Sequence, residues 1–557
     1  MNNYLLHISK DQERKEMRIS DWLGNVQHPV KEEKLQTKSI DLVSHSTKQS
    51  LYTPNENLSV LIIKYYTRED GNSLAKEMAS SYENGNLDNY FNKLDGELSV
   101  ILIDAKRNRI VIYSDRFGLI PTYIYADASS VFISSNPKNI YLSKSEIQVR
   151  KESINCFVET GQLLGIHSWF EQVELIDSSI KLEIDIDTFT VQRDYYWTWE
   201  EVQRSDLSFE DSVNKLAETF EAAVSKRKSV SNNTTLLLSG GLDSRLILSC
   251  LDKGDIKYSS TFSKRKSEEL EIAKSLALNK KIEHKHLELN KENWLENRLE
   301  NIWNLDAGFS FMHDHVAPFK TNKVSEDEFV FNGFGGGILF AGNYIEEGNN
   351  PITEQKARKH WGEYWTETDL NSPYHNLNKI EPYFLNTRLR RFTCSGTRTL
   401  LPATPLLPFI DKDFITLLMS IDDNYRKDRK LFKSVALRLD KKLFTDFTYS
   451  QLGRPITADK TLKYRFKGYY HHFLQKIFGI ESISYVDYKR WSEGLVKKRD
   501  RLLNNDSLIN QYLAAPDLSF DSLNLEKFGR VLTVEIYLQQ LFNNKYLTTQ
   551  ELKTAIS

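Results

Sequence analysis

The sequence predicts an α/β protein with two domains, an antiparallel β-rich domain followed by a doubly wound parallel sheet with a helical C-terminal part. A length of 557 residues favours two or three domains. Over the first 200 residues, short β-rich runs alternate with polar turns. From residue 234 onward, a strand, a loop and a helix follow one another four times, which is typical of a parallel sheet.

The N-terminal domain is predicted over residues 1–203. Residues 98–104 and 110–115, LSVILID and IVIYSD, form a hairpin pattern around a polar turn. Further short strands are expected at TYIYA, SVFISS and IKLEIDI, with few amphipathic helices between them. A Ser/Asp-rich segment after YYWTW begins a helix, which places the domain boundary near residue 203.

The second domain, residues 204–557, carries the parallel sheet. Its four predicted strands are residues 234–238, 256–262, 283–289 and 328–333. In such sheets ligands bind beyond the carboxyl ends of the strands. The loops after the first and fourth strands are therefore expected to line one crevice, although about 90 residues separate them. From about residue 380 onward the chain is predicted to be mostly helical.

Composition and charge exclude several classes of protein. Lys+Arg 74 against Asp+Glu 76 gives a net charge of -2, so neither nucleic acid nor a membrane surface is an expected partner. No stretch reaches the roughly 18 unbroken apolar residues of a membrane span, and the first residues lack a basic segment followed by an apolar run, so a cytoplasmic location is expected. Cys156, Cys250 and Cys394 form no CxxC pair, so neither disulfides nor structural zinc are expected. A homo-oligomer is compatible with the sequence.

Glycine is scarce and is concentrated in two places. The chain has 24 glycines, where about 39 are expected at the usual frequency of about 7%. Five of them fall in GFGGGILFAG, residues 333–342, and Gly240 and Gly241 are adjacent in LLLSGGLDSR. Because glycine lets the backbone approach another group closely, both places are candidate ligand contacts.

The loop from Ser239 to Ser244, here called the SGG loop, carries the clearest signal. Backbone N–H groups after the strand and the positive end of a helix beginning at Asp243 converge on an anion such as phosphate. The loop is not a Walker loop, because GxxxxGK[ST] is absent. The Asp243 carboxylate is suited to a magnesium ion that bridges protein and phosphate. The alternative is an ordinary strand–helix turn capped by Asp or Ser.

This loop resembles the pyrophosphate loop of ATP pyrophosphatases, and specifically that of the asparagine synthetase family. Residues 94–125 are similar to the family's N-terminal glutaminase-type domain, which implies an Ntn-type antiparallel fold of the class II glutamine amidotransferases. TFSKRKSEELEIA, FNGFGGGILFAGNY and LPFIDKDFI follow in the order of the family's synthetase motifs. The order of five motifs, from residue 90 to about 460, carries the resemblance.

The resemblance implies a ligase that uses ATP and Mg²⁺. ATP activates a carboxylate as an acyl-adenylate, pyrophosphate leaves, and an amine then forms the amide. By the family's pattern, adenosine contacts Leu238, Thr261 and Phe262, and Asn332 and Gly333 close the nucleotide pocket. Asp243 is the implied metal ligand, and the pyrophosphate contacts are Ser239, Gly240, Gly241, Asp243 and Ser244. Thr261 and Phe262 can equally be an ordinary strand end.

Lys433 is the implied catalytic lysine that stabilises the adenylation transition state. It precedes Arg438 in RKLFKSVALR with a spacing close to that of the family. Arg429 and Lys430 compete for the role, and a solvated basic helix face is the alternative reading of all three.

Three departures from the family pattern shape the expected function. Glutamine-using members carry cysteine at residue 2 as the nucleophile, and this chain has Asn2, so ammonia or a substrate amine is expected instead of glutamine. Gly337 and Ile338 replace the usual Asp-Glu, which removes one metal carboxylate and predicts weakened activity; a glycine hinge or a degenerate site is the alternative. Thr404 and Leu406 replace Glu-x-Arg, so aspartate is not the expected substrate.

Relatives without the cysteine include β-lactam synthetases and lasso peptide cyclases. The expected partners are therefore a small-molecule, peptide or sugar carboxylate and an amine donor. A non-catalytic nucleotide-binding scaffold is the second hypothesis, and tRNA thiolation is a third, disfavoured by the lack of paired cysteines and of a basic face. The His313-Asp314-His315 segment is expected to lie on the surface and not to bind a metal.

Overall fold

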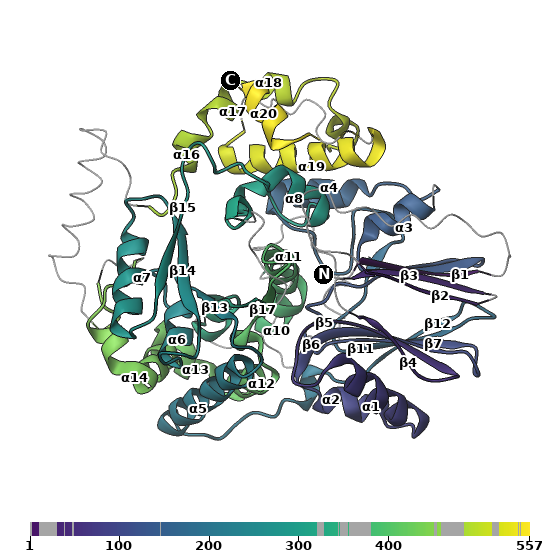
Figure 1. The fold of residues 1–557 in the computed structure, drawn as a ribbon, viewed down its shortest axis with the longest axis horizontal. Coiled ribbons are helices and arrows are strands. Elements are labelled where there is room, and N and C mark those ends of the chain that lie inside the picture. The colour runs from purple at the N-terminus through teal and green to yellow at the C-terminus, as the bar shows by residue number, and fades with distance from the viewer. Residues whose placement is uncertain are drawn as a thin grey trace.

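The computed structural model describes residues 3–9, 31–37, 39–46, 49–144, 146–319, 328–342, 345, 355, 380–450, 454–457, 484–514, 523–543, 545 and 547–556. Two stacked antiparallel sheets form the N-terminal part, and one parallel sheet lies beside them in the second part (Figure 1). The predicted fold class is confirmed. No helix in these ranges is long and apolar enough to cross a membrane.

The first sheet has six strands in the order β10-β8-β9-β1-β3-β2. Its central strand β1 pairs antiparallel with β3 on one side and β9 on the other. The strands are β1 (Asn3–Ser9), β2 (Lys31–Gln36), β3 (Ile40–Ser46), β8 (Tyr123–Ala126), β9 (Ser130–Ser134) and β10 (Glu174–Leu175).

The second sheet also has six strands, in the order β12-β11-β7-β6-β5-β4. The predicted hairpin is β6 and β7, which pair Val100 with Tyr113 and Leu102 with Val111. The strands are β4 (Leu51–Asn55), β5 (Leu58–Thr67), β6 (Gly96–Asp104), β7 (Arg109–Ser114), β11 (Ile180–Asp185) and β12 (Val191–Tyr195).

Helices cover the outer faces of both sheets and produce four layers. Because side chains alternate along a strand, one face of each sheet fills the core between them, and the other face packs on helices. Leu74 and Met78 of α1 (Gly71–Glu83) pack on the second sheet together with α2 (Leu87–Lys93). The first sheet is covered by α3 (Pro137–Ser143) and α4 (Lys151–Thr160). The expectation of few helices here is wrong for α1, whose Asp70 cap accepts the N–H groups of Asn72 and Ser73.

The parallel sheet has five strands in the order β15-β14-β13-β16-β17. The four predicted strands correspond to β13 (Thr234–Leu237), β14 (Tyr258–Ser263), β15 (His284–Glu288) and β16 (Phe329–Phe331). The fifth, β17 (Thr404–Leu406), was not predicted, because it has three residues and contains Pro405. An edge strand tolerates proline, since its outer side forms no ladder.

The helices of the second part surround this sheet and extend over the first. Residue 203 lies between β12 and the first of them. They are α5 (Phe209–Lys228), α6 (Asp243–Ser249), α7 (Glu268–Asn279), α8 (Arg298–Asn304), α10 (Ile380–Phe384), α11 (Arg390–Arg398), α12 (Lys412–Ser420), α13 (Asp423–Arg426), α14 (Lys430–Thr445), α16 (Tyr488–Trp491), α17 (Glu493–Lys497), α18 (Arg499–Leu502), α19 (Leu525–Asn543) and α20 (Thr549–Ile556). The long helix α19 packs on α4 and α8, so one apolar core spans both parts of the chain (Figure 1).

A buried ion cluster also joins the two parts. Arg227 of α5 donates to Glu97 of β6 and to Asp411 before α12, both at 2.9 Å. Lys226 adds contacts to Asp411 and Asp95 at 3.1 and 2.8 Å. Burial raises the pKa of Glu97 to about 7, although the Arg227 charge opposes the rise. These pairs dock the second sheet of the N-terminal part against α5.

Candidate active site

The candidate site lies where the strand order of the parallel sheet reverses. From β13 the chain proceeds to β14 and β15 on one side, whereas β16 and β17 lie on the other side. Ligands bind at such a switch point, outside the carboxyl ends of the strands. The SGG loop follows β13, the glycine cluster of residues 333–342 follows β16, and both line one cavity of about 670 Å³. The predicted shared crevice is confirmed, and its volume suits a small-molecule ligand.

The glycine cluster lies directly against Asp243. A Cβ atom added at Gly333 would lie 3.0 Å from the Asp243 Cβ, and one at Gly336 would lie 2.7 Å from the Asp243 Cγ. The Gly337 N–H donates to Asp243 Oδ2 at 2.9 Å. Gly337 therefore offers a backbone amide to Asp243 where the family pattern implied a second carboxylate.

Hydrogen bonds within and beneath the SGG loop fix its shape. Ser244 Oγ accepts the Ser239 N–H, and Ser239 Oγ accepts the Gly241 N–H, both at 3.1 Å. The fully buried Arg245 donates to the Gly240 carbonyl at 3.3 Å and to the Thr448 carbonyl at 2.6 Å. The loop is thus held to the segment after α14 as well as to its own helix.

Most residues predicted to bind the nucleotide meet at this cavity. Those that line it are Leu238, Ser239, Gly241, Asp243, Ser244, Thr261, Phe262, Asn332 and Gly333. Gly240 is not among the lining residues, because its backbone packs against Ser450 and Glu269. The Thr261 hydroxyl donates to the Leu238 carbonyl, so Thr261 is both a strand-end contact and part of the wall.

Asp243 and Glu269 are the carboxylates of the described cavity wall. Asp243 faces the cavity, and its separation from bulk solvent raises its pKa to about 6, opposed by the Gly337 amide and the Arg429 guanidinium. Burial also raises the pKa of Glu269. Both carboxyl groups lose charge more readily than exposed ones, and a bound cation would reverse this effect.

The donor set fits a magnesium ion that is shared with a polyphosphate. No group of three His, Cys, Asp or Glu side chains within the described ranges could hold a metal ion by itself. Mg²⁺ is usually held by one or two carboxylates together with phosphate oxygens and waters. Asp243 within the SGG loop would supply the protein part of such a site.

A strained kink brings Arg429 to the same cavity. Asp428 and Arg429 have φ values of 53° and 59°, in the left-handed region that costs non-glycine residues of order 1–3 kcal/mol each. The buried Arg426 just before them pairs with Glu381 at 2.5 and 2.7 Å and donates to the Leu339 carbonyl in the glycine cluster. These contacts fix the kink against the cavity wall.

The three predicted cations occupy different places. Arg429 lines the cavity, whereas Lys433, one turn further along α14, is not among its lining residues. Lys430 directs its ammonium group over the Phe209 ring, 4.5 Å from the centroid. Sequence spacing favoured Lys433, and only the left-handed turn before α14 explains why the earlier Arg429 reaches the site.

His313 and His315 also line the cavity, and the surface position expected of the two histidines is wrong for His315, which is partly buried. Asp314 is buried and accepts a hydrogen bond from Asn301 at 2.7 Å. His315 stacks on Phe262 and on Tyr488, and burial lowers its pKa well below the usual value. His313 alone is exposed and pairs with a surface glutamate. Tyr488 lies 173 residues away in the chain, so local sequence gave no signal of this packing.

A second cavity, of about 390 Å³, lies across one segment from the first. Gly396, Thr399 and Leu400 line the switch-point cavity, whereas Arg398 and Leu401 of the same segment line the second one. The second cavity is otherwise bordered mainly by the N-terminal part, including Tyr65, Tyr66, Ser135 and Asn136.

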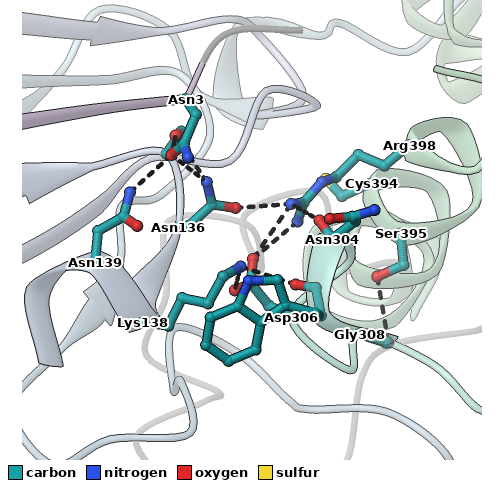
Figure 2. A network of polar contacts seen from close by, with 12 residues as sticks. Asn3, Asn136, Lys138, Asn139, Asn304, Asp306, Gly308, Cys394, Ser395 and Arg398 are labelled. Atoms are coloured by element: carbon teal, nitrogen blue, oxygen red, sulfur yellow. Dashed lines mark hydrogen bonds and ion pairs between the residues drawn. The ribbon is translucent and has the colours of Figure 1, made fainter. Parts of the chain in front are cut away.

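Buried polar side chains link the two parts of the chain at this segment (Figure 2). Arg398 donates to the Asn136 side chain at 2.7 Å and to Asp306 Oδ2 at 3.2 Å, and Lys138 donates to Asp306 Oδ1 at 2.5 Å. Asn3 Oδ1 accepts from Asn136 at 2.8 Å and from Asn139 at 2.7 Å. Asn3, Asn136, Lys138, Asn139, Asp306 and Arg398 are together called the interdomain seam.

None of the three cysteines is placed as a reactive thiolate. Cys156 and Cys394 are buried. Burial raises the pKa of Cys250 to about 12 and that of Cys394 to about 11. Because the thiolate is the nucleophilic form, the raised pKa values make Cys250 and Cys394 less reactive than exposed thiols.

Comparisons with known proteins give two family-model matches and two curated relatives. Residues 215–392 match the Asparagine synthase family model, and residues 55–141 match the Glutamine amidotransferase domain model. The chain is 24% identical over 313 residues to asparagine synthetase (glutamine-hydrolyzing) of Gallus gallus, covering 53% of each protein. It is 22% identical over 432 residues to asparagine synthetase (glutamine-hydrolyzing) 2 of Bacillus subtilis (strain 168), covering 68% of this chain and 57% of that one. The chain thus spans just over half the length of these curated relatives.

Two solved structures are similar at a low level. The allosteric regulatory enzyme of purine biosynthesis gives a TM-score of 0.22 at 8% identity, covering 42% of this chain and 54% of that one. The glutamine phosphoribosylpyrophosphate amidotransferase from B. subtilis, complexed with ADP and GMP, gives 0.19 at 9% identity, covering 55% and 62%. Neither of these two structural similarities is used to infer the family or the function of the chain. The two family-model matches and the two asparagine synthetases support a relationship between this chain and the asparagine synthetase family.

Proposed function

We propose that the chain is an ATP-dependent carbon–nitrogen ligase that forms an amide through an acyl-adenylate. The observation that carries this proposal is the meeting of the SGG loop, Asp243 and the glycine cluster at one switch-point cavity. Similarity to the asparagine synthetase family supports the same reaction class. A substrate carboxylate oxygen bonds to the α-phosphorus of ATP, the bond from that phosphorus to the β-phosphate bridge breaks, and pyrophosphate leaves. An amine then attacks the acyl carbon, AMP leaves, and the nitrogen loses a proton.

Different residues of the cavity bind different parts of the nucleotide. The SGG loop binds the departing pyrophosphate, where negative charge develops. Leu238, Thr261 and Asn332 enclose the adenosine. This contact holds the α-phosphate near the acceptor carboxylate and so lowers the entropic part of the reaction barrier. Asp243 holds Mg²⁺, which when bound would neutralise phosphate charge and orient the polyphosphate.

The nitrogen donor is ammonia or an amine of the substrate. The raised pKa values of Cys250 and Cys394 and the burial of Cys156 support a reaction without glutamine hydrolysis. The acceptor is a small-molecule, peptide or sugar carboxylate with an apolar portion, because Phe309, Phe334 and Leu400 line the cavity. Leu406 is buried in the core and Thr404 borders the second cavity, so neither supports aspartate recognition.

A non-catalytic nucleotide-binding scaffold is the alternative function. One observation favours it: the Gly337 N–H donates to Asp243 Oδ2, and residue 337 itself supplies no carboxylate. A scaffold of this kind would bind ATP and release no pyrophosphate.

Pyrophosphate release separates these functions. The parent protein and Asp243→Ala are incubated with ATP, Mg²⁺, ammonium and a panel of carboxylates, and pyrophosphate is measured. The ligase reading predicts carboxylate-dependent release that Asp243→Ala abolishes. ATP binding without release from any mixture supports the scaffold, and a parent that binds no ATP overturns both. A parent that works with glutamine as the sole nitrogen source contradicts the proposed donor.

A further inference from the structure

Glu269 is a carboxylate of the cavity wall that the described part of the chain does not pair. It lies in the first turn of α7, after Ser267, whose hydroxyl accepts the Leu270 N–H at 3.2 Å. Within the described ranges its carboxylate forms no hydrogen bond or ion pair. The positive end of a helix helps to keep such a group ionised. This wall therefore presents a negative charge that the described protein does not neutralise.

The carboxylates of Glu269 and Asp243 belong to different regions of the cavity wall. An added Cβ at Gly240 would lie 3.2 Å from the Glu269 Cα, so the backbone of α7 packs on the SGG loop. Arg429 acts on Asp243 by its charge, but neither of these two charges contributes to the pKa shift of Glu269. Burial raises the pKa of Tyr485 to about 12, and the Glu269 charge adds to the rise. Asp243 thus belongs to the phosphate and metal region, and the Glu269 carboxylate lies on the side of Tyr485.

Aromatic rings lie beside this second region. Phe262 and His315 line the cavity and stack with their ring centroids 5.6 Å apart. Tyr485 packs edge-on against both rings, at 6.4 Å and 5.6 Å. Because burial lowers the pKa of His315 well below its usual value, this imidazole presents a neutral ring and not a positive charge. A carboxylate beside neutral aromatic rings attracts an organic ammonium group through an ion pair and cation–π contacts.

We propose that Glu269 binds the ammonium group of an organic amine, that Phe262 and His315 contact its carbon skeleton, and that this amine is the nitrogen donor. The inference rests on the proposed function and narrows its donor from ammonia or an amine to an organic amine. Only a neutral amine attacks the acyl carbon, so the ammonium first transfers one proton to the Glu269 carboxylate. The electron pair freed on nitrogen then forms the amide bond as AMP leaves.

The test compares two probes that differ in charge. Ligand-observed NMR titrations of the full chain, without nucleotide, measure its affinity for benzylamine, which is protonated at neutral pH, and for uncharged benzyl alcohol. The parent should bind benzylamine about 10- to 100-fold more tightly than benzyl alcohol, the range for a hydrogen bond to a charged group. Glu269→Gln should remove this preference and leave the affinity for benzyl alcohol unchanged. Glu269→Asp, which keeps the charge, should recover part of the preference.

Glu271→Gln is the matched control. Glu271 lies in the same helix, but its side chain is 70% exposed and pairs with Lys274 at 3.2 Å. This variant should bind both probes like the parent. Loss of the preference in Glu271→Gln, or its survival in Glu269→Gln, would overturn the role of Glu269. A parent that binds the two probes equally, or binds neither, would overturn the amine site itself.

Competition identifies the occupant of this region. Displacement of benzylamine from the parent by Mg²⁺ would make Glu269 a metal ligand, and displacement by an equal concentration of ammonium would favour ammonia as the donor; either result overturns the inference. Calorimetry with Mg²⁺ and α,β-methylene-ATP, an ATP analogue that cannot transfer its adenylate, tests the proposed function separately. Binding of the analogue without a preference for benzylamine overturns this inference alone. A preference for benzylamine without binding of the analogue overturns the ligase proposal and leaves an amine site that serves no ligase.

Discussion

Two pairs of consecutive left-handed residues in the described part of the chain lie at contrasting places. Asp306 and Ala307, with φ values of 52° and 49°, belong to the junction between the two parts of the chain. Asp428 and Arg429, at 53° and 59°, border the switch-point cavity. Both pairs carry a charged side chain into a shielded environment, but the partners of that charge differ.

Protein groups surround the charge at the seam. Asp306 receives Lys138 and Arg398 at its carboxylate, and its carbonyl accepts the Trp169 indole N–H at 2.5 Å. Arg429 has a cavity in front of it and no described carboxylate within ion-pair distance. Strain therefore does not by itself identify a ligand site. The partners of the charged side chain make the difference. A charge that is paired with protein groups indicates a structural junction, and a charge that faces a cavity indicates a binding site.

Breaking the seam should produce the largest effect on stability. Arg398→Met leaves Asp306 and Asn136 buried with a missing partner, and removal of one partner of a buried ion pair typically costs about 3–5 kcal/mol. Urea unfolding measures the loss, and affinity for the ATP analogue in the folded fraction should stay within about threefold.

The matched control for the seam is Arg204→Met. Arg204 also pairs with an aspartate, Asp422 at 3.1 Å, but its side chain is 73% exposed. Exposed pairs contribute about 0–1 kcal/mol. Equal losses for Arg398→Met and Arg204→Met would contradict the structural role of the seam.

A substitution in the switch-point cavity should weaken ligand binding and should not lower stability, which is the reverse of the effect expected at the seam. Asp243→Asn removes the proposed metal carboxylate and should weaken binding of Mg²⁺ and the ATP analogue by about 100-fold, or about 2.7 kcal/mol. Calorimetry checks the affinity. Binding that is unchanged in Asp243→Asn would remove Asp243 from the site.

The same substitution should raise stability in a pH-dependent way. Burial raises the pKa of Asp243 from its ordinary value of 3.8 to about 6 in the fold, so the folded protein holds this proton more tightly than the unfolded chain. Stability from this group is present below pH 3.8 and is lost as pH rises to 6. At pH 8, Asp243→Asn should therefore have a free energy of unfolding about 1–3 kcal/mol higher than the parent. Denaturant unfolding measures this difference. The gain should disappear near pH 4.

The contact between the glycine cluster and Asp243 predicts a smaller effect. Gly336→Ala places a methyl group 2.7 Å from the Asp243 Cγ, whereas the Gly337→Ala methyl lies 3.2 Å from Oδ2. Gly336→Ala should displace the carboxylate and weaken Mg²⁺-dependent nucleotide binding by about tenfold, the lower end for groups that support a metal ligand. Gly337→Ala should cost less. The reverse ranking would show that the cluster acts through another contact.

Lys433→Gln should have the smallest effect. Because Lys433 does not line the cavity, nucleotide affinity and pyrophosphate release should change by less than about twofold, within the usual range for a surface charge. A loss of pyrophosphate release with unchanged affinity would restore the catalytic role that its position in the sequence implies.

The sequence was sufficient to predict the parallel sheet and the meeting of two glycine-rich loops, because strand–loop–helix repeats and strand-end glycines are local patterns. It missed β17, whose three residues include a proline, and α1, whose apolar stripe is short. The seam could not be predicted, since Asn3, Lys138, Asp306 and Arg398 meet only after the two parts dock. Arg429 was ranked below Lys433 because spacing along a helix does not reveal the left-handed turn before it.

The SGG loop and the glycine cluster are expected to form one nucleotide site. Hydrogen–deuterium exchange with and without Mg²⁺ and α,β-methylene-ATP tests it directly. We expect slower exchange in residues 238–244 and 332–342 together, which are distant in sequence and line one cavity. Protection that is absent from both segments, or confined to residues 46–71 around the second cavity, would contradict the claim.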